Sequence, residues 1–237
     1  MKQHEAVMKA MEANGGYATL AHLYREVLKI TGVRWGTKTP FASIRRIVQD
    51  PRFFFRIRPG LWALNDWKDK IPFAATEKAP RKEDTFTHSF YQGLVVEIGN
   101  MKNFGTFVPN QDKNKKYLTT PLADLRTMSE LHPFSYKRFL DCASTIDVAW
   151  FNDRKMPHSF FEIEHTTDML SALVKFVELQ DFSSRFVIVA DRNRRAEFTD
   201  RLSREAFRPV ASRVTFWDYE TLSNAHSKAY QSVLLGV

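Results

Sequence analysis

Two short apolar segments that carry acidic residues constrain the fold of this chain most strongly. Residues 145–151 (TIDVAWF) and 159–165 (SFFEIEH) both have the composition of β-strands. In the second segment, the two-residue period of a strand places Glu162 and Glu164 on one face and the apolar residues beside them on the other. The flanking residues are strongly apolar, which indicates a central strand, and two same-face acids on a central strand are costly without a partner. The pattern therefore predicts a buried acidic site on a sheet.

A divalent cation is the partner that these acids predict. Asp147, on the first segment, would join Glu162 and Glu164 on adjacent strands, where three carboxylates repel one another unless a cation lies among them. Hard oxygen ligands suit Mg²⁺, and Mn²⁺ is expected to substitute for it. A metal held in this way, with water in its remaining positions, is typical of enzymes that hydrolyse phosphodiesters. The alternative is structural: Asp147 would bond a turn at a strand end, and the glutamates would lie on the exposed face of an edge strand.

The segments around this pair predict an α/β domain. Hydrophobic periodicity predicts, in chain order, a helix over 88–99, strands over 105–109, 146–151 and 160–164, a helix over 168–179, a strand over 185–190, a helix over 194–207 and a strand over 214–217. Glu97 lies near the end of the first helix and Lys175 lies on the second. Helix, three strands, helix and strand, with acids on the second and third strands, resembles the core of the PD-(D/E)XK nuclease superfamily over about residues 86–220.

The resemblance implies a restriction-endonuclease-like core, in which helices flank a central mixed β-sheet, and it implies roles for the acids. Asp147 matches the superfamily's aspartate on the second strand, and Glu162 matches the first acid of the third-strand motif. Glu164 stands where the superfamily usually has lysine, as in the minority of its restriction enzymes that carry Glu-x-Glu. Asp147 and Glu162 would then hold the metal, Glu97 would complete its shell, and Glu164 would orient or deprotonate the attacking water. Lys175, on the following helix, is the other candidate for the role of the lysine.

Residues 1–65 predict a second, smaller domain. Helices are expected over 5–13, 19–30 and 41–48, followed by strands over 53–57 and 61–64 that a Pro-Gly turn joins. Three helices and a hairpin make a winged helix-turn-helix. The runs 36–40 (GTKTP) and 52–64 (RFFFRIRPGLWAL) resemble the HARE-type winged-helix modules that occur beside DNA-modifying and restriction domains.

This second resemblance implies DNA contacts, because the third helix of such a module enters the major groove while the wing lies along the backbone. The candidate groove residues are Ser43, Arg45 and Arg46, and the candidate phosphate or minor-groove contacts are Arg34, Lys38, Arg52, Arg56 and Arg58. Beyond this module, Lys115 and Lys116 belong to a polar loop where nucleases approach the DNA backbone. For any one of these side chains the alternative is a solvated charge, and winged helices also bind protein.

The distribution of charge supports two domains with different tasks. The net charge of the chain is +8, and residues 1–83 hold 16 Lys and Arg against 8 Asp and Glu, whereas residues 84–237 hold 19 of each. A basic module joined to a neutral, acid-bearing one suggests a polyanion-binding domain beside a catalytic one. We place the binding domain at 1–65, a charged and proline-containing linker at 66–85, and the catalytic domain at 86–237.

Composition excludes several other classes of protein. The single cysteine, Cys142, excludes an internal disulfide framework and a cysteine zinc site. No apolar run approaches the roughly 20 residues of a membrane span, no signal-peptide pattern opens the chain, and a cytoplasmic location is expected. No Walker loop or dinucleotide glycine motif is present, which argues against a nucleotide-driven activity.

Taken with the two resemblances, these features predict a Mg²⁺-dependent endonuclease of type II restriction kind. Its substrate would be double-stranded DNA at a specific target, which can include a modified base. Cutting both strands usually requires two sites, so a homodimer is expected. Two alternatives stay open: a non-cleaving DNA-binding regulator or accessory subunit with a degenerate nuclease fold, and a nuclease that is silent until a partner motor or methyltransferase joins it.

Overall fold

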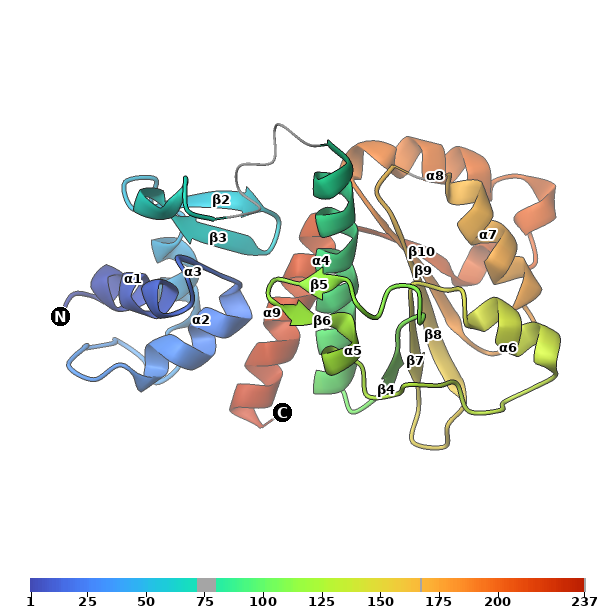
Figure 1. Ribbon diagram of the computed structural model, residues 1–237, viewed down its shortest axis with the longest axis horizontal. Coiled ribbons are helices and arrows are strands. Elements are labelled where there is room, and N and C mark those ends of the chain that lie inside the picture. The colour runs from blue at the N-terminus through green and yellow to red at the C-terminus, as the bar shows by residue number, and fades with distance from the viewer. Residues whose placement is uncertain (72–79, 167, 237) are drawn as a thin grey trace. The chain divides into compact units, whose positions relative to one another are not determined.

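The computed structural model describes residues 1–71, 80–166 and 168–236, and the side chains of 80–84 are not among the described parts. The chain divides into two compact units, Met1–Glu83 with Ser227–Val237, and Asp84–His226. Of the predicted linker, residues 66–85, the part 72–79 lies outside the described residues. The linker is shorter than predicted, because Asn65–Trp67 form a 3₁₀ turn and Pro80–Met101 form a helix. Each unit has its own β-sheet (Figure 1).

The first unit consists of short helices around a small antiparallel sheet. Its elements are α1 (Gln3–Ala13), β1 (Tyr17–Ala18), α2 (Leu20–Glu26), the 3₁₀ turn η1 (Val27–Lys29), α3 (Phe41–Ile47), β2 (Phe54–Arg58), β3 (Leu61–Leu64) and the 3₁₀ turn η2 (Asn65–Trp67). The sheet has the order β1-β3-β2. Buried side chains from all three helices and from the hairpin, among them Met11, Leu23, Ile44 and Phe54, form one core. Each predicted helix and strand of residues 1–65 is found within a few residues of its expected bounds. The local sequence pattern is therefore sufficient to predict the secondary structure of this region.

Glycine is required at the end of α1. Gly16 has φ of +86°, and a Cβ at this position would lie 2.3 Å from the ring of Trp67. Both the left-handed backbone and the close ring exclude a side chain here. The Asn14-Gly15-Gly16 stop therefore fixes how the chain leaves α1 and enters β1.

The second unit is built on a five-stranded mixed sheet of order β10-β9-β8-β7-β4. The strands are β4 (Gly105–Phe107), β7 (Val148–Phe151), β8 (Pro157–Glu164), β9 (Arg185–Ala190) and β10 (Val214–Asp218). Pairing is antiparallel between β4 and β7 and between β7 and β8, and parallel between β8 and β9 and between β9 and β10. The strand that carries Glu162 and Glu164 thus pairs on both sides, which confirms the predicted central strand and excludes the edge-strand alternative.

Helices cover both faces of this sheet (Figure 1). They are α4 (Pro80–Met101), α5 (Leu122–Leu125), α6 (Lys137–Ala143), α7 (Met169–Glu178), α8 (Arg195–Leu202) and α9 (Tyr219–Leu235), with 3₁₀ turns η4 (Arg192–Arg194), η5 (Glu205–Phe207) and η6 (Ala211–Arg213) and a small hairpin of β5 (Lys116–Tyr117) and β6 (Thr120–Pro121). The main core lies between the sheet and the α6, α7 and α8 side, with Phe160, Phe176 and Phe186 at its centre. On the other side, α4 packs closely against the sheet at Gly99. A Cβ at this position would lie 2.5 Å from Thr106 and 2.6 Å from Trp150, so the close approach requires glycine.

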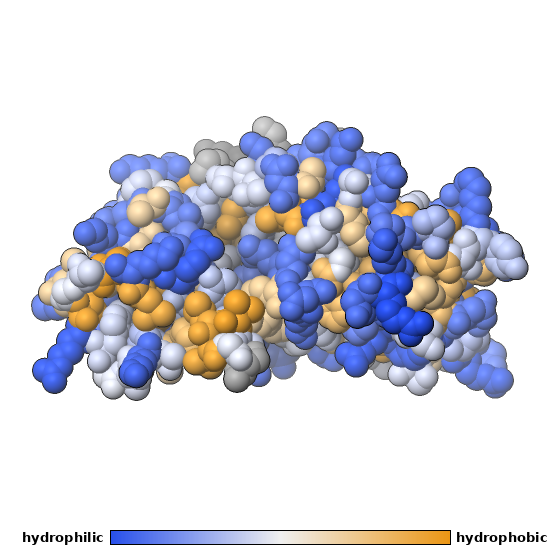
Figure 2. Space-filling model, turned by 90° about the horizontal axis from the view of Figure 1, so that it is seen from below, coloured by the Kyte–Doolittle hydropathy of each residue, from blue (hydrophilic) through white to orange (hydrophobic). Residues whose placement is uncertain are grey.

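On the face shown in Figure 2, apolar patches lie between charged and polar side chains. Among the described residues, exposed large apolar side chains include Val233, Leu234 and Leu235 at the end of α9. No helix in the described part of the chain is both long and apolar enough to cross a membrane.

Candidate active site

Asp147 lies at the end of the sheet, directly before β7. Val148 pairs with Phe161 across the antiparallel β7–β8 ladder, so one further step of the register places Asp147 opposite Glu162. Asp147 is buried, and its Oδ2 accepts a hydrogen bond of 2.7 Å from the backbone N–H of Ile163 and one of 3.1 Å from Nε2 of His88. Two elements, β8 and α4, therefore fix one carboxylate at the carboxyl end of the parallel strands, where α/β sheets commonly bind ligands.

Glu162 pairs with a lysine from the neighbouring helix. The side chain of Glu162 is almost fully buried, and its Oε1 accepts a 2.7 Å hydrogen bond from Nζ of Lys175 on α7. The same Nζ donates a 3.0 Å hydrogen bond to the backbone oxygen of Thr145. The structure thus places a lysine beside the second acid of the site, but from α7 rather than from the strand.

The protonation of this pair reflects the surplus of carboxylates around it. Burial, the negative charge of Asp147 and the smaller effect of Glu164 raise the pKa of Glu162 well above its usual value, although Lys175 opposes the shift. For Lys175, burial disfavours the charged form, but the charge and hydrogen bond of Glu162, together with the charges of Asp147 and Glu164, outweigh burial and raise the pKa of the amine. The charge of the Lys175 ammonium group is therefore well compensated, whereas the carboxylates of Asp147, Glu162 and Glu164 have too little positive charge near them.

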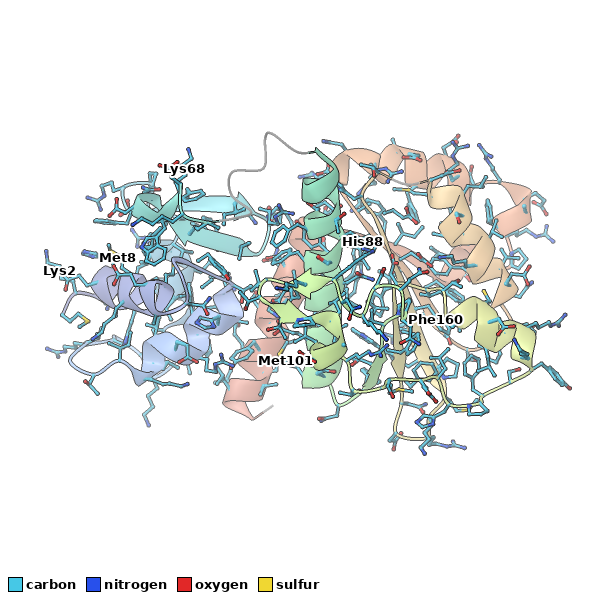
Figure 3. All side chains as sticks on the ribbon, in the orientation of Figure 1. Lys2, Met8, Lys68, His88, Met101 and Phe160 are labelled. Carbon is cyan, nitrogen blue, oxygen red and sulfur yellow. The ribbon has the colours of Figure 1, made fainter. Side chains whose placement is uncertain are left out.

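A second set of ligand atoms meets at Asp147. His88, Asp112 and Asp147 each offer one atom to a group in which all the atoms lie within 4.8 Å of one another. His88 comes from α4, on the side of the helix that faces the strands (Figure 3), and Asp112 comes from the loop after β4. Burial disfavours protonation of His88, but its hydrogen bond to Asp147 and the charges of Asp147 and Asp112 raise the pKa of the imidazole. A cation in this group would displace that proton.

The surroundings of this group fit a divalent cation. Nε2 of Gln92, one turn after His88 on α4, donates hydrogen bonds of 2.8 Å to Oδ2 of Asp112 and 3.2 Å to the backbone oxygen of Asp147. Within the described part of the chain, Oε1 of Gln92 and Nδ1 of His88 are buried and have no hydrogen-bond partner. Buried polar atoms without partners are rare in native proteins. The carboxylate and amide oxygens suit Mg²⁺ and Mn²⁺, whereas an imidazole nitrogen is more typical of transition-metal sites.

Glu164 and Glu97 are placed differently from each other. Glu164 is buried at the end of β8 on the same face as Glu162, and Nη1 of Arg194 donates a 2.8 Å hydrogen bond to its backbone oxygen. Glu97 lies nine residues after His88 on α4, which at about 100° per residue turns it to roughly the opposite side of the helix. Its Oε2 accepts hydrogen bonds from the hydroxyl of Tyr117 (2.9 Å) and from Nε2 of His226 (2.7 Å). The structure brings Asp147, Glu162 and Glu164 together and leaves Glu97 in another cluster.

The predicted DNA-contacting residues differ in exposure. On α3, Ser43 and Arg46 are exposed, whereas Arg45 is partly buried and donates a 3.3 Å hydrogen bond to the hydroxyl of Tyr24. Arg52 pairs with Asp50, and the guanidinium of Arg56 lies over the ring of Trp62. In the remaining positions, Arg34, Lys38 and Lys116 are exposed, Arg58 is partly exposed, and Lys115 pairs with Asp112 at 2.6 Å.

His88 and Asp112 were not among the site residues predicted from the sequence. The histidines of the chain lack a metal-ligand spacing, and the loop containing Asp112 resembles an ordinary solvated loop. One signal was available: His88 and Gln92 are polar residues four apart on an otherwise apolar stretch of helix, so they share a face. A polar stripe on a helix that packs against a sheet indicates a buried polar site.

Neutralising Glu162 is expected to stabilise the metal-free protein. Glutamate in an unfolded chain loses its proton near pH 4.5, whereas the raised pKa keeps folded Glu162 protonated to higher pH. Between these two pKa values the folded state holds more protons, so the free energy of unfolding falls as pH rises. We expect Glu162→Gln to raise the melting temperature in EDTA by roughly 2–8 °C near pH 8, and by less near about pH 5.

Melting curves of the wild type and the variant across this pH range check the expectation, with Glu130→Gln, an exposed position before α6, as the control. A gain that is equal at both ends of the range would contradict a raised pKa, and a loss of stability would show that the bond to Lys175 dominates.

The comparisons with known proteins relate the chain to restriction enzymes. The family model described as the type II restriction enzyme NmeDI C-terminal domain matches residues 70–234, well over half of the chain. The type II restriction enzyme NmeDI of Neisseria meningitidis serogroup C is 29% identical over 133 residues, an alignment that covers 52% of this chain and 37% of that enzyme. The match thus spans well under two thirds of the relative's length, and no solved structure matches the chain. On the strength of the family match, the chain belongs to the NmeDI C-terminal domain family of type II restriction enzymes.

Proposed function

We propose that this protein is a Mg²⁺-dependent endonuclease that hydrolyses phosphodiester bonds of duplex DNA at a specific target. The observation that supports it most is the arrangement of Asp147, Glu162 and Lys175, in which two buried carboxylates and an ammonium group meet at the carboxyl end of the central strands. Isolated buried carboxylates are costly, so such a cluster at a ligand-binding edge indicates a functional site rather than a structural one.

The residues would divide the chemistry between them. Asp147 and Glu162 would hold the metal beside the scissile phosphate, and His88 and Asp112 would supply further ligands. A bound Mg²⁺ would stabilise the charge that develops on the phosphate oxygens. Lys175 would orient the attacking water and hold Glu162 in place, which leaves Glu164 to tune the charge of the site.

The first unit would bind DNA and so hold the catalytic unit near its substrate. Its helices and hairpin occur in the order of a winged helix-turn-helix, and we place the exposed face of α3 in the major groove, with Ser43 and Arg46 toward the bases. The basic balance of residues 1–83 suits a phosphate backbone. Because one site cuts one strand, we propose a homodimer as the active form.

The test is cleavage of defined DNA. Plasmid and phage DNA, unmodified and methylated at adenine or cytosine, would be incubated with the full chain and Mg²⁺ or Mn²⁺. Discrete fragments that disappear in EDTA or with Ca²⁺ alone are expected, and the substrate that is cut would reveal any dependence on modification. Binding to DNA without cleavage of any substrate would instead support a DNA-binding regulator or an accessory subunit.

Within the first unit, Arg46→Ala is expected to weaken DNA binding. The side chain is exposed on α3, so its removal should lower affinity by roughly three- to tenfold and reduce the salt dependence by about one ion if the contact is to phosphate. Fluorescence anisotropy in Ca²⁺ at several salt concentrations measures both quantities. Lys9→Ala, which removes the same charge from an exposed position on α1, is the matched control, and equal losses in the two variants would argue against α3 as the contacting helix.

A further inference from the structure

The second unit carries a pocket on the face of its sheet opposite to the side chain of Glu162. Neighbouring residues of a strand point to opposite faces, so Phe161, which lines this pocket, faces away from Glu162. The pocket has a volume of about 540 Å³, within the range of small-ligand sites. Its walls come from the turn after α4 and from β7, β8, β9 and β10. Nothing in the chemistry described above uses it.

Aromatic rings form a continuous row along this pocket. Ring centroids are 4.3 Å apart between His158 and Phe104, 5.4 Å between Phe104 and Trp150, 4.4 Å between Trp150 and Phe161, and 6.0 Å between Phe161 and Trp217. Phe104, His158 and Trp217 keep part of their surface accessible. Partly exposed rings at the edge of a pocket offer faces on which a planar ligand can stack.

Two cations stand at the same pocket. Lys102 and Arg185 line it, both are exposed, and neither side chain makes a hydrogen bond or an ion pair with another described residue. No acidic residue occurs among the described residues that line the pocket. Burial, followed by the charges of Arg185 and Lys102, lowers the pKa of His158, so the positive charge here comes from the lysine and the arginine.

We propose that this pocket binds a single nucleotide, with the base stacked on the partly exposed rings of Phe104 and Trp217 and the phosphate between Lys102 and Arg185. A planar ring and an attached anion are the two features that the pocket complements, and a nucleotide has both. The nucleotide is either free in solution or an unpaired nucleotide of a DNA molecule. In the second case, the pocket would be a DNA contact that takes no part in cleavage. Binding at this pocket requires neither a metal nor the acidic site.

Binding measured in EDTA tests the proposal separately from cleavage. Calorimetry with dTMP, and anisotropy with a labelled duplex carrying one unpaired thymidine and with its fully paired counterpart, distinguish the two sources. The variants are Lys102→Ala with Arg185→Ala, which removes the cations, and Trp217→Ala, which removes a stacking surface. Arg204→Ala with Arg208→Ala removes the same charge from exposed positions after α8 and serves as the matched control. Melting curves establish that each variant is folded.

We expect the duplex with the unpaired thymidine to bind more tightly than the paired duplex, and each pocket variant to lose this preference with a roughly tenfold drop in affinity. Binding of dTMP without a preference for the unpaired duplex would identify free nucleotide as the source. Absence of dTMP binding together with equal affinity for both duplexes would overturn the proposal. A pocket variant that alters self-association in sedimentation but not nucleotide binding would overturn it as well, in favour of a contact between copies of the chain.

Discussion

Asp147→Asn is expected to lower the Mg²⁺-dependent rate of DNA cleavage by roughly 10³-fold, which corresponds to about 4 kcal/mol of transition-state stabilisation. Asp147 is the residue common to both parts of the site. It lies opposite Glu162, one step beyond the first pair of the β7–β8 ladder, and its carboxylate lies within 4.8 Å of ligand atoms of His88 and Asp112. An amide has the same shape, and its oxygen can still accept the 2.7 Å hydrogen bond from Ile163. The substitution therefore removes a negative charge and an anionic ligand while leaving the fold intact.

Single-turnover cleavage of a substrate that the wild type cuts measures the effect. Asp153→Asn, an identical change at an exposed position after β7, is the matched control and should leave the rate unchanged. DNA affinity in Ca²⁺ should differ little between wild type and Asp147→Asn, which separates catalysis from binding. Retention of more than a tenth of the wild-type rate would remove Asp147 from the catalytic site.

The parts of the site that the sequence predicted depend on local patterns. The alternation around Glu162 needs only a few consecutive residues, because a strand places every second side chain on the same face. The apolar flanks of that segment likewise indicated a central strand, and β8 is the middle strand of the five. Asp147 followed from the preceding segment of the chain, since hairpin-connected strands tend to be neighbours.

The parts that were missed depend on contacts between distant residues. His88 and Asp147 are 59 positions apart, and only the packing of α4 against the end of the sheet brings them to 3.1 Å. Asp112 comes from a loop, whose course no periodicity predicts. Glu97 illustrates the converse: it lies on the expected helix, but the helical phase turns it toward Tyr117 and His226. A residue's place in an element can thus be predicted locally, whereas its direction relative to the sheet requires the packed structure.

Lys175→Ala is expected to lower the cleavage rate by roughly 10²- to 10³-fold, whereas Glu164→Gln should lower it by less than about tenfold. The sequence left both residues as candidates for the role of the missing strand lysine. Nζ of Lys175 lies 2.7 Å from Oε1 of Glu162, and its pKa is raised by that carboxylate despite burial, so it is a charged donor inside the site. Glu164 adds a further negative charge to a group of acids that already lacks compensation, which makes it a poor substitute for a lysine.

A second substitution of Lys175 distinguishes a catalytic role of this lysine from a positioning role. Lys175→Gln retains a hydrogen-bond donor for Glu162 but loses the charge, so it should be as inactive as Lys175→Ala if the ammonium group acts on the water or the phosphate. Recovery of most of the rate in Lys175→Gln would show that the lysine only positions Glu162. Single-turnover cleavage in Mg²⁺, with melting curves for each variant, distinguishes these outcomes, and Lys137→Ala on the exposed side of α6 is the control for loss of a lysine. If Glu164→Gln proves to be the more damaging change, the strand residue carries the role and the ion pair on α7 is structural.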